Sequence, residues 1–168
     1  MNIVLTGFMG SGKTVVGNAL ARKLNRRFLD TDAMIEAQSE ISIKEFFEKF
    51  SEYRFRLLER EIVKRAARYK DVVISCGGGV VLTMDNIKFL RRKGIIVNLY
   101  ASPKEIYGRI KGGSSRPLLN CPNPVSKIRE LLKKRKELYA DCDYSFETDG
   151  LSADEAAEKI LDKISDKI

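Results

Sequence analysis

The amino-acid sequence predicts an α/β fold in which helices cover both faces of one central parallel sheet of five strands. Three observations lead to this prediction. Short apolar runs alternate along the chain with segments whose apolar residues recur three and four positions apart. The first apolar run leads into a glycine-rich stretch that opens the next helix. Finally, the chain has 168 residues, 43% of them hydrophobic, so it is long enough for one compact core and short for two.

Five runs rich in Val, Ile, Leu, Phe or Tyr are predicted as strands. Runs of this length are typical of strands in a buried parallel sheet when turn residues bound them. In chain order they are NIVLTG (2–7), RRFLDTD (26–32), VVISCGG (72–78), GIIVNLYA (94–101) and YSFETDG (144–150).

Six other segments are predicted as helices, because apolar residues three and four apart form one stripe along a helix. In chain order these are 13–24, 42–50, 55–69, 84–93, 125–141 and 152–164. Two segments interrupt the simple alternation. One is an extended helical stretch at 33–69, and the other is KGGSSRPLLNCPNP at 111–124, whose Gly, Ser and Pro content predicts a mobile loop.

The net charge of +8 is concentrated in residues 109–136, where basic residues outnumber acidic ones several-fold. This pattern fits a site that collects several negative charges, although most lysines of KIRELLKKRKELY are expected on a solvated helix face. The chain has no histidine, so any proton transfer must use carboxylates or water.

Composition also bears on location. No apolar run approaches the roughly 18 residues that a membrane span requires. The cysteines Cys76, Cys121 and Cys142 are odd in number and lack the paired spacing of a zinc site. We therefore expect a cytoplasmic protein whose cysteines are packing residues.

The most specific motif is GFMGSGKT at residues 7–14, which matches the phosphate-binding pattern GxxxxGK[ST] between a strand and a helix. Its glycines let successive backbone N–H groups face inward, and the helix N-terminus adds partial positive charge. Lys13 is expected to bridge the outer phosphates of a nucleotide, and the Thr14 hydroxyl to coordinate magnesium. The candidate nucleotide-binding residues in this loop are Gly10, Ser11, Gly12, Lys13, Thr14 and Val15.

Two carboxylates, Asp30 and Asp32, end the second predicted strand in the sequence LDTD. Residues two apart on a strand point to the same side, here toward the crevice where open α/β sheets bind ligands. Asp30 can then orient the magnesium shell, which matters because the third strand ends in glycines rather than in a metal-orienting Asp. Asp32 is left to accept a hydrogen bond from an acceptor hydroxyl. The alternative is that both carboxylates cap the next helix.

A further candidate pair lies on a predicted helix, where Arg56 and Glu59 of YRFRLLERE are three apart on one face. Arg56 can bind a substrate carboxylate through two hydrogen bonds while Glu59 holds the guanidinium in place. An exposed, salt-bridged helix gives the same pattern without any binding role.

Six sequence elements together resemble those of shikimate kinases in order and approximate spacing. They are the phosphate loop, DTD at 30–32, FRxxE at 55–59, GGG at 77–79, RPLL at 116–119 and RxxLY at 135–139. The resemblance covers nearly the whole chain. It implies a three-layer P-loop NTPase fold like that of nucleoside monophosphate kinases, in a single kinase domain at 1–168. Within it, the resemblance implies a helical substrate-binding segment at about 31–60 and a mobile lid at about 110–124.

The resemblance further implies ATP-dependent phosphorylation of the 3-hydroxyl of shikimate, in the pathway to chorismate and the aromatic amino acids. Lys13 and Thr14 would hold phosphates and magnesium, and Asp30 would reach the metal through water. Arg116 would swing over the transferring phosphoryl group from the lid. Arg109 matches an adenine-stacking arginine of the family, and Ala153 falls near a family proline that lines the adenine site.

On the acceptor side, the resemblance implies that Arg56 and Arg135 clamp the shikimate carboxylate. Asp32 would bind ring hydroxyls and take the proton, which makes Lys13, Asp32 and Arg116 the implied catalytic residues. Three glycines would let the ring approach the backbone closely. The implied substrate-binding residues are Asp32, Arg56, Gly77, Gly78, Gly79 and Arg135.

Two other functions stay open at this point. A kinase acting on gluconate or on a nucleoside monophosphate would share the phosphate loop and lid, with less reason to keep both arginines beside Asp32 and the glycines. A basic, nucleotide-switched protein could instead use KKRK at 133–136 to bind nucleic acid. We expect the small molecules shikimate and ATP as partners, Mg²⁺ as cofactor, neither nucleic acid nor membrane, and a monomer.

Overall fold

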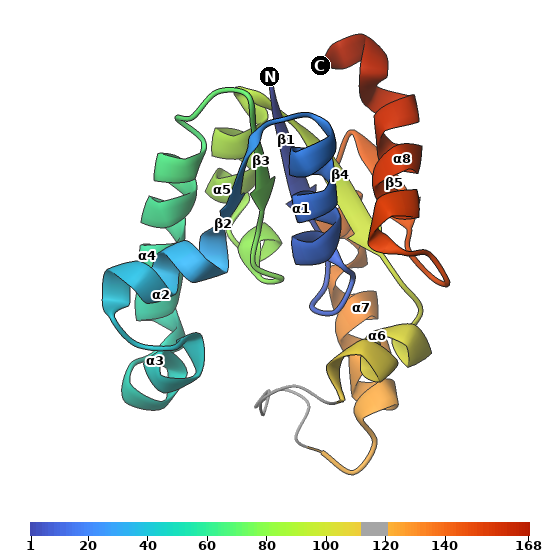
Figure 1. The fold of residues 1–168 in the computed structure, drawn as a ribbon. Coiled ribbons are helices and arrows are strands. Elements are labelled where there is room, and N and C mark those ends of the chain that lie inside the picture. Colours follow the sequence, from blue (N-terminus) through green and yellow to red (C-terminus); the bar gives the residue numbers. More distant parts are fainter. Residues whose placement is uncertain (112–120) are drawn as a thin grey trace.

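The computed structural model describes residues 1–111 and 121–168, and it confirms the predicted α/β fold (Figure 1). Five parallel strands form one sheet in the order β2-β3-β1-β4-β5. The strands are β1 (Asn2–Thr6), β2 (Arg27–Asp30), β3 (Val72–Ser75), β4 (Gly94–Tyr100) and β5 (Tyr144–Glu147). All five predicted strands are therefore present, each shorter than its predicted range.

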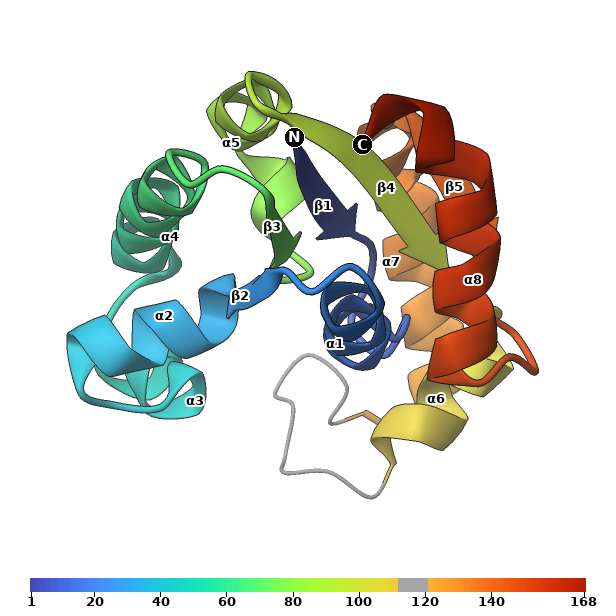
Figure 2. The ribbon, with the colours of Figure 1, turned by 45° about the horizontal axis from the view of Figure 1, so that its top comes forward.

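Helices cover both faces of the sheet, as Figures 1 and 2 show. The helices α1 (Lys13–Lys23) and α8 (Ala153–Ile164) lie on one face, with a short 3-10 turn η3 (Ser165–Lys167) after α8. The opposite face carries α5 (Met84–Arg91) and α7 (Pro124–Ala140).

Strand side chains alternate between the two resulting cores. Ile3 and Leu5 join the core under α1 and α8, while Val4 between them joins the core on the other face. This alternation follows from the period of two in a strand. Because both faces are buried, the strands read in the sequence as continuous apolar runs.

A helical unit of α2 (Thr31–Ser39), α3 (Ile43–Lys49) and α4 (Glu52–Ala66) projects beyond the sheet on the side of β2 (Figure 1). It has a small apolar cluster of its own, made of Ile35, Phe46, Phe55 and Ile62. Together with the packing of α4 on the sheet, this cluster holds the unit beside the carboxyl ends of the strands.

Helix α4 begins and ends three residues earlier than the predicted range of 55–69. The prediction placed its start at the first apolar residue, whereas the Ser51 side chain caps the helix by accepting a hydrogen bond from the Arg54 amide at 3.4 Å. After the C-cap residue Ala67 the chain turns, and Asp71 adopts a positive φ just before β3. Cap residues, rather than the apolar stripe, determine where this helix begins.

Among the described residues, α6 and the two short 3-10 helices, η1 and the η3 turn after α8, are absent from the sequence prediction. Helix α6 (Pro103–Ile110) starts at Ser102, whose hydroxyl accepts from the Glu105 amide at 3.3 Å, and has Pro103 in its first turn. Serine followed by proline and, three residues on, by glutamate is a helix-start signal that the prediction overlooked. The short 3-10 helix η1 (Val80–Leu82) follows the glycines after β3.

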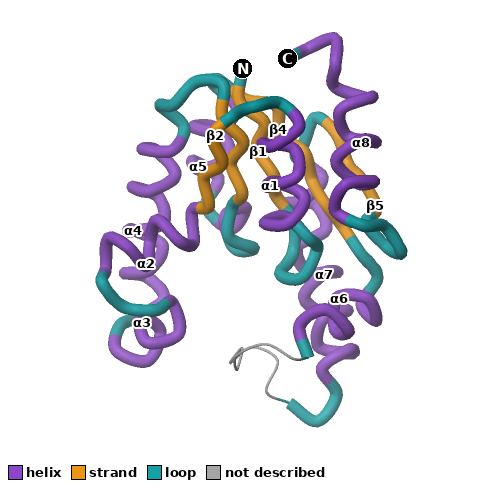
Figure 3. Tube along the Cα trace, viewed as in Figure 1, coloured by secondary structure: helices purple, strands orange, loops and turns teal. Residues whose placement is uncertain are grey.

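All strands run in the same direction, so their carboxyl ends meet at one edge of the sheet, where Figure 3 shows the loops that follow β1, β3 and β4. The register pairs Asp30 with Ser75 and Ser75 with Leu5, so β2, β3 and β1 end at nearly the same level. Thr6 pairs with Asn98, so β4 extends two residues further. The sheet is extended on one side of β1 by β3 and β2 and on the other side by β4 and β5, so the strand order changes direction at β1. Ligands of open α/β sheets bind at such a point. Within residues 1–111 and 121–168, no helix is long and apolar enough to cross a membrane.

Replacing Gly7, the first residue of the phosphate loop, with alanine is expected to lower the free energy of unfolding by about 2–3 kcal/mol. Gly7 has φ 138°, and an added β-carbon would overlap the Leu99 carbonyl oxygen, a backbone atom that cannot move aside. Gly108 in α6 has no atom within 4 Å of an added β-carbon, so Gly108→Ala should raise stability by up to about 1 kcal/mol. Urea denaturation measures both changes, and equal midpoints for the two variants would contradict this account of Gly7.

Candidate active site

The phosphate loop connects β1 to α1 at the centre of this edge of the sheet. Gly12 caps α1 in the left-handed conformation, with φ 93°, which turns the first amides of the helix toward the loop. Lys13 is 8% exposed, and its Nζ donates a hydrogen bond to the Phe8 carbonyl at 2.9 Å. The loop therefore places an ammonium group and a helix N-terminus together, which is an arrangement suited to phosphate groups.

The predicted metal-binding pair, Thr14 and Asp30, is brought together from α1 and β2. The Thr14 Oγ1 hydroxyl donates to Asp30 Oδ2 at 3.0 Å. The other carboxylate oxygen of Asp30 accepts from the amides of Asp32 at 3.0 Å and Ala33 at 3.3 Å, at the start of α2. Asp30 thus caps a helix, as the alternative expected, and faces Thr14 at the same time, while its role in metal binding stays a prediction.

Asp32 does not lie at the end of the second strand, and the prediction of two strand carboxylates was wrong in this respect. Strand β2 ends at Asp30, and Asp32 belongs to the first turn of α2. The strand ends at Asp30 because the Asp30 side chain accepts hydrogen bonds from the free amides in the first turn of α2, and the helix begins at the next residue. The Asp32 carboxylate still faces the glycines that follow β3, because a β-carbon added at Gly77 would overlap Asp32 Oδ1. Gly77 itself donates its amide to Thr31 Oγ1 at 3.0 Å.

Arg56 and Glu59 form an ion pair on α4, with 2.9 Å between Arg56 Nη1 and Glu59 Oε2. Glu59 is only 1% exposed, so the pair differs from the fully exposed helix pair that the sequence also allowed. Burial raises the pKa of Glu59, against the opposing effect of Arg56. Burial acts to lower the pKa of Arg56, but Glu59 and Glu52 outweigh it and raise that pKa. The Arg56 guanidinium is therefore charged, and its ion pair with Glu59 restricts its position.

The three glycines lie between Arg56 and α7. A β-carbon added at Gly79 would overlap Arg56 Nη1, so the guanidinium packs directly on this residue. The Gly78 carbonyl accepts a hydrogen bond from the Tyr139 hydroxyl of α7 at 2.6 Å. Burial raises the pKa of Tyr139, against the opposing effect of the nearby Arg135 and Arg56. The two arginines predicted to act together, which are far apart in the sequence, therefore both lie close to this tyrosine.

Arg135 completes this side of the site. Its guanidinium carbon lies 5.8 Å from the centre of the Phe8 ring, which belongs to the phosphate loop. The candidate acceptor region is therefore bounded by Asp32, Arg56, the three glycines and Arg135, and it adjoins the phosphate loop. Arg116, which was expected above the transferring phosphoryl group, lies outside the described residues.

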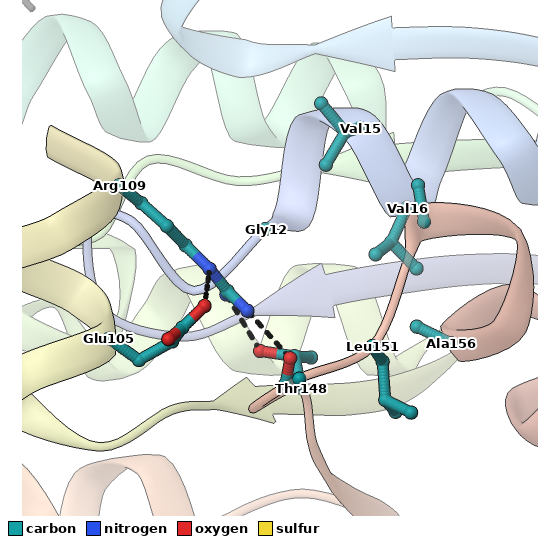
Figure 4. Close-up of a pocket in the computed structure, with 10 residues that line it drawn as sticks. Gly12, Val15, Val16, Glu105, Arg109, Thr148, Leu151 and Ala156 are labelled. Atoms are coloured by element: carbon teal, nitrogen blue, oxygen red, sulfur yellow. Dashed lines mark hydrogen bonds and ion pairs between the residues drawn. The ribbon is translucent and has the colours of Figure 1, made fainter. Parts of the chain in front are cut away.

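Arg109 lines a second pocket (Figure 4), with a volume of about 190 Å³, to which Gly12 of the phosphate loop also contributes. Its guanidinium donates to Glu105 at 3.0 Å, to the Gly10 carbonyl at 3.3 Å and to Thr148. Ala153 lines the same pocket. The lining residues are Gly12, Val15, Val16, Glu105, Arg109, Thr148, Gly150, Leu151, Ala153 and Ala156.

Several contacts at the site escaped the sequence analysis, although Phe55 and Tyr139 belong to the FRxxE and RxxLY motifs. Phe55 lies beneath Arg56, with 5.2 Å between its ring centre and the guanidinium carbon, and Phe47 packs on Phe55 at 4.5 Å. Phe47 is 39% exposed, although it is a large apolar residue beside the acceptor region. Thr148 and Tyr139 contact site residues through hydrogen bonds that no local pattern reveals. The available signals were the aromatic residues inside the FRxxE and RxxLY motifs and Phe47 before the first of them.

The cysteine adjoining the glycines is a core residue. Cys76 is buried in the apolar cluster between the sheet and the helices α4, α5 and α7. Burial raises the pKa of its thiol, which keeps the group protonated at neutral pH. For Cys76, this agrees with the prediction that the cysteines are packing residues.

Comparison with known proteins assigns the family. A family model described as shikimate kinase matches residues 9–165, which is most of the chain. The chain belongs to the shikimate kinase family. The shikimate kinase of Thermodesulfovibrio yellowstonii is 48% identical over 160 residues, covering 95% of this chain and 92% of that protein. The shikimate kinase of Caldicellulosiruptor saccharolyticus is 46% identical, covering 95% and 93%.

A solved structure extends the likeness to three dimensions. The shikimate kinase of Acinetobacter baumannii in complex with shikimate superimposes with a TM-score of 0.94 at 40% identity, covering 99% of this chain and 94% of that chain. Membership of the shikimate kinase family makes this chain a kinase, an enzyme that transfers a phosphoryl group from ATP.

Proposed function

We propose that this chain transfers the γ-phosphoryl group of ATP to the 3-hydroxyl of shikimate, giving shikimate 3-phosphate and ADP. The observation that carries the proposal is that Arg56 packs on Gly79, while Arg135 lies against Phe8 of the phosphate loop and near Tyr139, whose hydroxyl binds the Gly78 carbonyl. A flat acceptor with a carboxylate at one end and hydroxyls at the other matches two cations at one end of the region and Asp32 at the other. Membership of the shikimate kinase family supports this choice of acceptor.

Acceptor binding starts from the arginines. Arg56 binds the substrate carboxylate, and Glu59 behind it fixes the guanidinium at 2.9 Å so that little side-chain entropy is lost on binding. Arg135 binds the same carboxylate from α7. Gly77, Gly78 and Gly79 present backbone rather than side chains, which lets the ring lie close to Asp32.

Asp32 accepts a hydrogen bond from the attacking hydroxyl and takes its proton. Phosphoryl transfer passes through a loose transition state, so orientation of the hydroxyl matters more than basicity. A carboxylate is sufficient for this purpose, which agrees with the absence of histidine from the chain. Lys13 and the amides at the start of α1 stabilise the charge on the phosphoryl oxygens. Arg116 is proposed to add to that charge stabilisation.

The residues present fit a magnesium ion. The Thr14 hydroxyl and the Asp30 carboxylate are hard oxygen ligands 3.0 Å apart beside the phosphate loop. Thr14 would hold the ion directly and Asp30 through water, with nucleotide phosphates and further waters as the remaining ligands. When bound there, magnesium neutralises charge that develops on the transferred phosphoryl group.

The nucleotide base is proposed to occupy the pocket beside Arg109. Guanidinium planes stack on aromatic rings, and most of the remaining lining is apolar or glycine, as suits the faces of a base. Gly12 of the phosphate loop lines this pocket, so a base in the pocket and phosphates on the loop belong to one nucleotide.

The basic residues of α7 give less support to nucleic-acid binding. Lys127 and Lys134 both pair with Glu130, at 3.0 Å and 2.6 Å, as expected of a solvated helix face.

The experiment that tests the proposed function is ADP release with Mg²⁺ and ATP, in the presence of shikimate, quinate, gluconate, AMP or no acceptor. We expect strong stimulation by shikimate alone. Stimulation by gluconate or AMP instead would show that this chain is a kinase for that acceptor and would contradict the shikimate proposal. If no acceptor stimulates turnover and the protein binds DNA or RNA with strong salt dependence, the kinase proposal fails in favour of a nucleic-acid-binding protein.

A substitution in the glycine wall, which is formed by Gly77, Gly78 and Gly79, tests the acceptor site. In Gly79→Ala, the new methyl group displaces the Arg56 guanidinium, a flexible group that can move without unfolding the chain. We expect the KM for shikimate to rise about tenfold while the KM for ATP stays within about twofold. Gly108→Ala, where the added methyl group meets no atom within 4 Å, is the matched control and should change neither constant. Equal rises in the KM for shikimate and the KM for ATP in Gly79→Ala would show that the glycine wall is not part of the acceptor site.

A further inference from the structure

Thr148 is a buried residue at the end of β5 that belongs to none of the motifs identified in the sequence. It is 2% exposed, and its amide donates to the Tyr100 carbonyl at 2.9 Å, continuing the pairing of β4 with β5 by one residue. This hydrogen bond positions Thr148 at the carboxyl edge of the sheet, facing both the phosphate loop and α6.

The Thr148 hydroxyl takes part in hydrogen bonds both as an acceptor and as a donor. A hydroxyl offers one hydrogen and two lone pairs. Thr148 Oγ1 accepts from Arg109 Nη1 at 2.9 Å and lies within donating distance of the Ser11 carbonyl at 3.1 Å and the Tyr100 carbonyl at 3.2 Å. Because Ser11 belongs to the phosphate loop, one side chain connects that loop to α6.

The main chain of the same residue holds Arg109 a second time. Arg109 Nη2 donates to the Thr148 carbonyl at 2.6 Å, so side chain and main chain of Thr148 bind the two ends of one guanidinium fork. Glu105 binds Nε at 3.0 Å from the other side (Figure 4). Together these contacts fix both the position of the guanidinium and the orientation of its plane.

We propose that Thr148 is a positioning residue for nucleotide binding, which holds Arg109 against the base pocket and couples it to the phosphate loop. The inference rests on the proposed ATP site and adds a residue to it. The burial of Thr148 increases the weight of these contacts, because a buried hydroxyl that loses a partner has limited access to water in exchange, whereas the Arg109 side chain stays 25% exposed.

The experiment compares Thr148→Val, which keeps the shape and removes the hydroxyl, with Thr148→Ser, which keeps the hydroxyl. The dissociation constant for ADP is measured by calorimetry, and the KM for ATP and for shikimate by ADP release. We expect Thr148→Val to raise the ADP dissociation constant and the KM for ATP about tenfold, with the KM for shikimate within about twofold. Thr148→Ser should restore ADP affinity to within about threefold of the unsubstituted protein.

Arg109→Ala and the double variant separate this inference from the proposed function. If Arg109→Ala leaves ADP affinity unchanged, the base pocket beside Arg109 is wrong, whatever Thr148 does. If Arg109→Ala weakens ADP binding, Thr148→Val should add less than about threefold in that background, because the two residues act as one unit. Additive losses, or a serine variant as weak as the valine variant, would overturn the role of Thr148. Should Thr148→Val fail to fold, Thr148→Ala takes its place with the same expected results.

Discussion

Replacing Lys13 with methionine is expected to lower kcat by about three orders of magnitude. Lys13 is the ammonium group of the phosphate loop, and methionine keeps most of its length while removing its charge. Because the side chain is largely buried, an apolar replacement should leave the fold intact. The measurement is ADP release at saturating ATP and shikimate, together with thermal unfolding to confirm that the variant is folded.

Lys23→Met is the control for this substitution. Lys23 lies at the other end of the same helix and pairs with Glu158 on α8 at 2.7 Å, away from the phosphate loop. Its loss should leave kcat within about twofold, since exposed ion pairs contribute little. A folded Lys13→Met variant that retains more than about a tenth of kcat would contradict the role given to Lys13.

Replacing Arg135 with alanine is expected to raise the KM for shikimate about a hundredfold while the KM for ATP stays within about threefold. The substitution removes a charged contact to the carboxylate, and contacts of this kind are worth 10- to 100-fold or more. Arg135 suits this test better than Arg56, whose removal would leave the buried Glu59 without its guanidinium partner.

Lys136→Ala is the matched control, since Lys136 is the next residue of α7 and is exposed. It removes one positive charge from the same helix without touching the glycines, so both KM values should stay within about twofold. Equal increases in both constants for Arg135→Ala, or a similar increase for Lys136→Ala, would show that Arg135 acts through net charge rather than by binding the carboxylate.

Much of the fold could be predicted because the signals are local. The phosphate loop lies within eight residues, and the pairing of Arg56 with Glu59 follows from the geometry of one helix. The alternation of strands and helices in turn implied a parallel sheet, which places all ligand-binding loops at one edge. Local sequence was therefore sufficient to predict which loops would meet.

The remaining contacts depend on how distant segments pack. The Tyr139 hydroxyl and the Gly78 carbonyl are 61 residues apart in the chain, and Arg109 and Thr148 are 39 apart. No periodicity in the sequence specifies such pairs, because the strand order and the packing of α6 and α7 create them. Asp32 was placed on the strand because alternation along β2 was extended past Asp30, where helix capping ends the strand.

The measurement that tests the central claim most directly is nuclear magnetic resonance of the product formed from shikimate, ATP and Mg²⁺ by the unsubstituted protein. The account predicts a single phosphorylated product in which phosphorus couples to the proton on the carbon that bears the 3-hydroxyl. Arg135→Ala should form the same product more slowly at low shikimate concentration. Phosphate on another hydroxyl, or inorganic phosphate as the sole new phosphorus signal besides ADP, would contradict the proposed placing of the acceptor against Asp32 and the three glycines.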